Sequence, residues 1–122
     1  MAKQLADGPL LRSQLGDYTD EEKALKRLCR AVVLRSMIDV LHYELKGTIP
    51  AMTSAGKVEK ERVCREAREF LFSREGGLWC RGAVIPVKEM YKIMSVTDRA
   101  EKANLLVLLD SAYRAVSTEG LR

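Results

Sequence analysis

The segment AVVLRSMIDVL at residues 31–41 constrains the fold more than any other part of the chain, because it is apolar on nearly every side of a helix. Only Arg35, Ser36 and Asp39 interrupt it. A helix of this kind cannot leave a broad face in water. We therefore predict that it lies at the centre of the fold or at an interface between subunits.

The sequence also marks the ends of the helix that contains this segment. Thr19, followed three residues later by Glu22, forms a capping box at its start. Gly47 is typical of the residue after the last turn of a helix, and Pro50 opposes continuation. These signals predict a helix from about residue 20 to residue 45 or 46.

The first half of this helix is amphipathic at about 100° per residue. One face carries three apolar side chains, Leu25, Leu28 and Val32. The opposite face carries four basic side chains, Lys23, Lys26, Arg27 and Arg30. We expect the apolar face to point to the core. The basic face either contacts phosphates or is a solvated helix face.

Four more helices are expected, at about residues 57–73, 78–83, 87–94 and 98–117. The glycine pair at 76–77 is interpreted as the end of the first of these, and Ser95 or Thr97 as the cap of the last. Five consecutive apolar residues, 105–109, require cover on several sides of the last helix. No segment alternates strictly between apolar and polar residues, so no strand is expected.

A chain of 122 residues with this pattern fits an all-α fold, a compact bundle of four to five helices with a helix-turn-helix-like corner. We place this single domain at residues 19–122. Residues 1–18 show no sustained period. We interpret them as an N-terminal arm that docks through Leu10, Leu11 and Leu15.

Several features indicate the compartment. No apolar run approaches the roughly 20 residues that a membrane span needs, and the N-terminus lacks the apolar core of a secretory signal. The three cysteines, Cys29, Cys64 and Cys80, form no C-x-x-C pair. Because their number is odd, we interpret them as buried thiols in a reducing compartment. The prediction is a cytoplasmic protein with no membrane partner.

The sequence carries no recognisable catalytic motif. A glycine-rich phosphate loop, a nucleophile elbow and an H-E-x-x-H pair are all absent. The single histidine, His42, has no ligand-type residue at metal-binding spacing, so a structural or surface role is expected for it. We therefore expect neither an enzyme nor a metal or cofactor site.

Residues 78–94 fit the pattern of a helix-turn-helix, in which the second helix presents polar side chains to the major groove. Ala83 is small, Ile85 fills the apolar turn position, and three side chains could pack inward, Met90, Ile93 and Met94. Lys88, Tyr91 and Lys92 would then face outward. Val84 stands where glycine commonly makes the turn, and a β-branched residue resists a positive φ. The alternative is a packing corner that buries Leu78, Trp79, Cys80 and Ile85.

Three segments carry a resemblance: EEKALKRLCRAVVLRSMIDVL (21–41), VCREAREFL (63–71) and WCRGAVIPVKEM (79–90). Together they resemble a class of small helical proteins encoded by bacteriophages and prophages. In that class, two helices precede a short W-[IV]-C-type segment and a helix-turn-helix-like corner. At the turn, residues 83–86 read Ala-Val-Ile-Pro where the class usually has Leu-Gly-[Ile/Leu]-Asp. The resemblance covers about half the chain and implies a bacterial host cell and a DNA-reading corner.

The net charge of +4 is compatible with an anionic partner. The positive excess is spread almost evenly along the chain, however, whereas a nucleic-acid binder usually concentrates it on one face. The charge therefore leaves two functions open.

The first function is DNA binding, for transcriptional regulation or for DNA recognition in packaging. Duplex DNA would be contacted by Lys88, Tyr91 and Lys92 and by the basic face of the first helix. The second function is a non-enzymatic protein-interaction module, either a phage factor that binds a host protein or a helical subunit of an assembly. Both predict a homo-oligomer or a protein partner. The predicted interface residues are Val33, Leu34, Met37, Leu105, Leu108 and Leu109.

Overall fold

The computed structural model describes residues 19–120, with side chains described up to residue 117. These residues form an all-α fold, as the sequence predicts. Its elements are α2 (Asp20–Lys46), the 3-10 turn η1 (Pro50–Met52), α3 (Lys57–Phe72), α4 (Arg74–Gly82), α5 (Val87–Met94) and α6 (Arg99–Gly120). The predicted docking of an arm through Leu10, Leu11 and Leu15 lies outside the described residues. None of the helices in residues 19–120 is long and apolar enough to cross a membrane.

Both predicted ends of α2 are confirmed. The hydroxyl of Thr19 accepts a hydrogen bond from the Glu22 backbone N–H at 3.2 Å and donates to the Glu22 carboxylate at 3.0 Å. Gly47 follows the last turn with φ of 68°, and its N–H donates to Tyr43 O. A left-handed residue at this place lets the chain leave the helix while a terminal carbonyl keeps its hydrogen bond.

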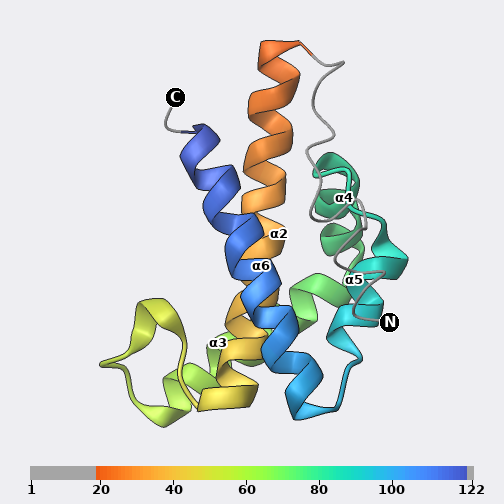
Figure 1. Ribbon diagram of the computed structural model, residues 1–122. Coiled ribbons are helices and arrows are strands. Elements are labelled where there is room, and N and C mark those ends of the chain that lie inside the picture. The colour runs from red at the N-terminus through yellow and green to blue at the C-terminus, as the bar shows by residue number, and fades with distance from the viewer. Residues whose placement is uncertain (1–18, 121–122) are drawn as a thin grey trace.

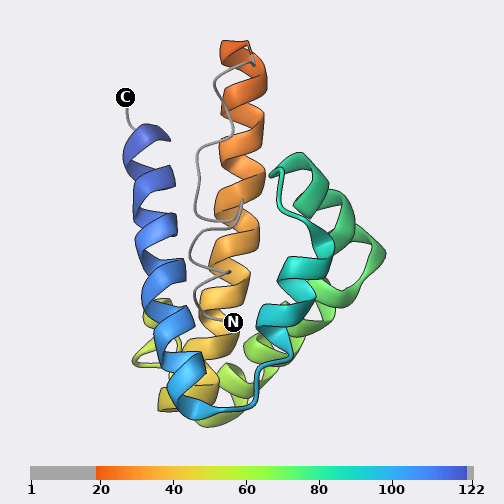
Figure 2. The ribbon, with the colours of Figure 1, turned by 45° about the vertical axis from the view of Figure 1, so that its right-hand side comes forward.

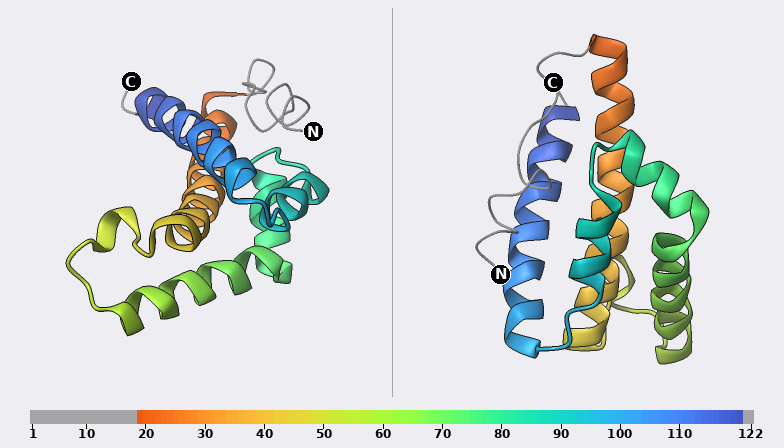
Figure 3. Two further views of the ribbon diagram at one scale, coloured as in Figure 1. Left: turned by 60° about the horizontal axis from the view of Figure 1, so that its bottom comes forward. Right: turned by 90° about the vertical axis from the view of Figure 1, so that its right-hand side faces the viewer.

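The helix α2 is the centre of the bundle. It contacts α3, α4 and α6, and α6 runs alongside it (Figures 1 and 2). Figure 3 shows α2 surrounded by the other helices. Its middle is buried on several sides, at Val33, Leu34, Met37, Ile38, Val40 and Leu41. Of the two places that the apolar segment 31–41 allows, the structure therefore selects the centre of the fold.

This placement corrects the predicted partner interface. Val33, Leu34, Met37, Leu105 and Leu109 are all buried inside the chain's own core, and Leu108 is half-buried. The middle of α2 packs against the buried side of α6, so the five buried side chains cannot contact a second molecule, whereas Leu108 keeps part of its surface and Val107 is 69% exposed. The sequence could not distinguish self-cover from cover by a partner, because both need the same apolar surface.

The first half of α2 also differs from the prediction. Leu25 and Leu28 are 60% and 56% exposed, whereas Arg30 is only 8% exposed. Arg30 lies on the same helical stripe as the buried Val33 and Met37, at spacings of three and seven residues. The buried residues in the middle of α2 therefore determine which face of the whole helix points to the core. The N-terminal end of the helix, which projects beyond α4 and α6, follows that face (Figure 1).

Two further helix limits differ from the prediction. Gly76 and Gly77 do not end α3, because the chain turns at Ser73 and both glycines lie inside α4. The Ser73 hydroxyl accepts a hydrogen bond from Gly76 N at 3.1 Å and so caps α4. The cap of α6 is Asp98 instead of Ser95 or Thr97. Its carboxylate accepts a hydrogen bond from Glu101 N at 3.0 Å.

The prediction that the cysteines are buried free thiols is confirmed for all three. Burial raises the pKa of each thiol, and that of Cys80 rises to about 11. Cys29 marks a close contact between α2 and α4, because a Cβ added to Gly82 would lie 2.8 Å from its Sγ. Only a glycine fits there without displacing the thiol.

One carboxylate oxygen, Asp39 Oδ1, is buried in the bundle at a cost. Asp39 Oδ1 lies 3.2 Å from Arg35 Nε, but within the described residues this oxygen receives no hydrogen bond of acceptable geometry. Burial raises the pKa of the Asp39 carboxyl, and the nearby Arg35 charge offsets this only in part. Folding therefore favours the protonated form of Asp39.

We predict that Gly82→Ala lowers the free energy of unfolding by about 1 kcal/mol, because the new methyl group overpacks against Cys29. In a Cys29→Ala background the same substitution should have almost no effect. Chemical denaturation of the four proteins of this cycle measures the coupling. Gly77→Ala is the control, since nothing lies within 4 Å of a Cβ there and alanine is the better helix former. Equal effects of Gly82→Ala in both backgrounds would contradict the close contact.

A second prediction concerns pH. The raised pKa of Asp39 means that the folded state binds its proton more tightly than the unfolded state does. The contribution of Asp39 to stability should therefore fall as the pH rises from about 3.8 through the raised value. The difference in unfolding free energy between wild type and Asp39→Asn, measured across that range, should show this fall. Asp110→Asn breaks a similar pair with Arg114 at a more exposed site and separates the effect of burial from that of the ion pair. A difference that rises with pH would contradict the burial of a charged carboxylate.

Candidate functional site at the α4–α5 corner

The corner between α4 and α5 is closed by a well-formed helix terminus. The N–H of Ile85 donates to Cys80 O at 2.9 Å, and the N–H of Val84 donates to Arg81 O at 3.0 Å. This pair of bonds, with the side chains of Ile85 and Cys80 both buried, is a Schellman motif. Val84 occupies its left-handed position with φ of 59°. The tight turn thus forms even though a β-branched residue stands where glycine is common.

The helix α5 presents three different sides. Met90, Ile93 and Met94 are buried against the core, as the sequence predicts. Lys88 and Lys92 lie one turn apart on the opposite side and are exposed. Within the described part of the chain, neither ammonium group forms a hydrogen bond or an ion pair. Both are therefore available to an anionic partner.

The third predicted contact on α5, Tyr91, lies on a different side from the two lysines. Its ring stacks on Phe72 at the end of α3, with ring centroids 5.1 Å apart and an interplanar angle of 14°. The other neighbour of Phe72 is the guanidinium of Arg68, 5.9 Å from the ring centroid. Phe72 thus contacts both a cation and an aromatic ring, and its stack with Tyr91 holds that side chain toward α3.

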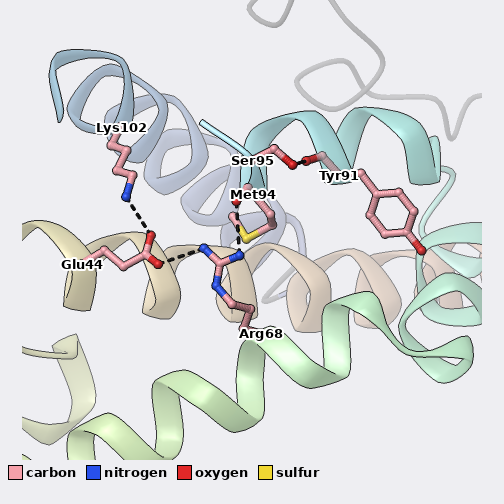
Figure 4. A network of polar contacts seen from close by, with 6 residues as sticks. All are labelled: Glu44, Arg68, Tyr91, Met94, Ser95 and Lys102. Atoms are coloured by element: carbon pink, nitrogen blue, oxygen red, sulfur yellow. Dashed lines mark hydrogen bonds and ion pairs between the residues drawn. The ribbon is translucent and has the colours of Figure 1, made fainter. Parts of the chain in front are cut away.

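A network of partly buried polar contacts holds the C-terminal end of α5 in place (Figure 4). Arg68 donates to Met94 O at 3.3 Å and to the Glu44 carboxylate at 2.8 Å. Lys102 donates to the other oxygen of Glu44 at 3.1 Å. Four helices, α2, α3, α5 and α6, meet in these contacts, so α5 is held by polar as well as apolar interactions.

A groove of about 530 Å³ lies between the end of α3, α4 and α5. The side chains that line it include Phe72, Arg74, Leu78, Arg81, Val87 and Tyr91. Arg74, Leu78 and Arg81 share one outer stripe of α4, at spacings of four and three residues. Leu78 is 54% exposed. The groove thus combines exposed apolar surface with two positive charges.

The predicted burial of the corner is therefore confirmed only in part. Cys80 and Ile85 are buried, Trp79 is half-buried, and Leu78 faces the groove. Sequence reasoning missed Phe72, Arg74 and Arg81 as members of a site. Their signal was the i, i+4, i+7 spacing on α4. It was hidden because the glycine pair was interpreted as a helix end, which removed Arg74 from the helix.

The basic face predicted on the first helix does not form as a unit. Arg30 is buried, which corrects its assignment as a nucleic-acid contact, and Lys23, Lys26 and Arg27 are half-buried. Arg27 lines a second, smaller groove of about 280 Å³ between α2 and α6, together with Leu28. These residues therefore present a mixed apolar and basic surface.

The predicted structural role of His42 agrees with its contact. Its Nδ1 lies 2.7 Å from Thr48 O, and since a carbonyl can only accept, this nitrogen donates. The bond joins α2 to the loop that follows it. Among residues 19–117, no group of three histidine, cysteine or acidic side chains could hold a metal ion.

We predict that Val84→Gly raises the free energy of unfolding by about 1 kcal/mol, because glycine adopts the left-handed conformation without the steric cost of a Cβ. Val84→Ala keeps a Cβ and should give only part of this gain. Thermal and chemical denaturation of the three proteins measure the order. Wild type more stable than Val84→Gly would mean that the contacts of the valine side chain outweigh its backbone strain.

Comparisons of the chain with protein families, with curated proteins and with solved structures found no match. The resemblance to the phage-encoded class therefore stays a prediction. The function proposed for this chain rests on the geometry of the corner.

Proposed function

We propose that the protein is a small helical DNA-binding protein that places α5 against duplex DNA. The observation that carries the proposal is the pair of exposed, unpaired lysines, Lys88 and Lys92, on the outer side of a helix whose inner side is locked into the core. Lys and Arg side chains held on a rigid helix are what phosphate contacts require. Regulation of transcription or DNA recognition in packaging would use such a contact.

The geometry of the corner supports this proposal further. The nine residues of α4, the turn at residues 83–86 and the eight residues of α5 match the size of a helix-turn-helix. Tyr91, which stacks on Phe72, would contact DNA only through the edge that remains exposed.

A second candidate function is a protein-interaction module, as part of an assembly or as a factor that binds a host protein. The observation that favours it is the exposed apolar surface around the groove, at Phe72 and Leu78. Large apolar side chains that stay in water next to a groove are typical of protein contacts. The two functions use different sides of the corner and are not exclusive.

The DNA proposal is tested by binding to a random-sequence duplex across a salt series. We expect Lys88→Ala/Lys92→Ala to weaken binding at least tenfold at low salt. The slope of log affinity against log salt should become shallower by about 2, since two phosphate contacts are lost. Lys46→Ala/Lys57→Ala removes the same charge from exposed positions at the end of α2 and the start of α3, and should change affinity less than twofold. Equal effects of the two double variants, or no binding by wild type at low salt, would overturn the proposal.

A further inference from the structure

The adjacent glycines of α4 differ in what the fold requires of them. A Cβ at Gly76 would overlap Phe70 O and lie 2.7 Å from Leu71 O, so the close turn between α3 and α4 needs a glycine there. A Cβ at Gly77 would meet nothing within 4 Å. Gly77 therefore has no packing reason to be glycine, although a glycine inside a helix costs about 0.5–1 kcal/mol relative to alanine.

The position of Gly77 shows what its missing side chain leaves open. It lines the groove between α3, α4 and α5, one turn from both Arg74 and Arg81. Any larger residue at this position would project into the groove from the wall of α4. Glycine at position 77 therefore lowers the stability of α4 and leaves the groove open.

The charge of the groove indicates the chemistry of its occupant. Arg74 and Arg81 flank Leu78 on one stripe, and no carboxylate is among the lining residues. Within the described residues, neither guanidinium forms a hydrogen bond or an ion pair. This differs from Arg62 and Arg68, which each pair with glutamate. Two unpaired guanidiniums on either side of an exposed leucine are complementary to acidic residues that flank an apolar side chain.

The aromatic residues of the groove favour a peptide over a nucleobase. A base binds by stacking on an open ring face. The ring of Phe72 already has two partners, the stacked ring of Tyr91 and the guanidinium of Arg68. What remains for the occupant is the edge of this stack together with the aliphatic side chains of Leu78 and Val87. Such a surface suits an apolar side chain.

We propose that this groove binds a segment of a partner protein in which acidic residues flank a large apolar side chain. The apolar side chain lies over Gly77 between Leu78 and the Phe72–Tyr91 stack, and the acidic residues pair with Arg74 and Arg81. The site is separate from Lys88 and Lys92, so this interaction does not depend on DNA binding.

The test begins with a library of random dodecapeptides displayed on yeast and sorted against the full-length protein. Peptides enriched in the sort are then synthesised with a fluorophore and titrated by fluorescence polarisation. We expect enrichment of sequences with at least two Asp or Glu residues close to a Leu, Ile, Phe or Trp. Arg74→Glu/Arg81→Glu should weaken binding at least tenfold, whereas Lys88→Ala/Lys92→Ala should change it less than twofold.

Gly77→Met blocks the groove without breaking the fold and should also weaken binding at least tenfold. Its melting temperature should equal or exceed that of wild type, because methionine is a better helix former than glycine and a Cβ at this position meets nothing within 4 Å. Gly56→Met is the matched control. It places the same side chain in open space at the start of α3, away from the groove, and should leave binding unchanged.

Four outcomes would overturn the proposal. The first is a sort that enriches no acidic and apolar sequences, and the second is peptide binding that survives Gly77→Met. The third is loss of DNA binding, instead of peptide binding, in the groove variants, which would make nucleic acid the occupant. The fourth is a concentration-dependent dimer that Gly77→Met abolishes, which would make the occupant a second copy of the chain.

Discussion

The bundle depends on one constraint, that the middle of α2 has to be covered on several sides. Ile38 and Val40 are both buried and lie on opposite sides of α2, so no single neighbouring helix could cover them, and α3, α4 and α6 all pack against α2. Hydrophobic burial of this kind is the main favourable term in folding. Of the two short helices, α4 packs against α2, and α5 is joined to α4 through the corner.

Charge is distributed unevenly between the bundle and the corner. Where helices meet, charged groups are paired, as in the contacts of Glu44 with Arg68 and Lys102. These contacts position the end of α5. At the corner, Lys88 and Lys92 have no carboxylate partner within the described residues. The positive charge is spread evenly along the sequence. In the folded structure, some of the basic side chains pair with carboxylates, whereas Lys88 and Lys92 stay available for a partner.

The corner combines features that lower stability with features that expose binding surface. Val84 adopts a left-handed conformation that disfavours a β-branched residue, and Gly77 weakens a short helix without easing its packing. Such local costs persist where the surrounding contacts hold the structure in place. Here the Schellman bonds and the buried side chains of α5 do so. These contacts hold the lysines of α5 and the groove beside Gly77 in fixed positions at the surface.

The sequence by itself determined the helical class, the limits of α2 and α5, and the burial of the three thiols. Thr19, Gly47 and Pro86 mark helix ends through contacts within a few residues of their own positions. The helix ends can therefore be predicted from the neighbouring sequence alone. Only the tertiary structure decided which face of a helix is covered, since that depends on elements distant in the chain. Arg30 is buried because it shares a stripe with Val33, and Leu105 and Leu109 of α6 are core because that side of α6 packs against α2. For the same reason, only the packing of α3 against α4 distinguishes the glycine that the fold needs from the one that opens a groove.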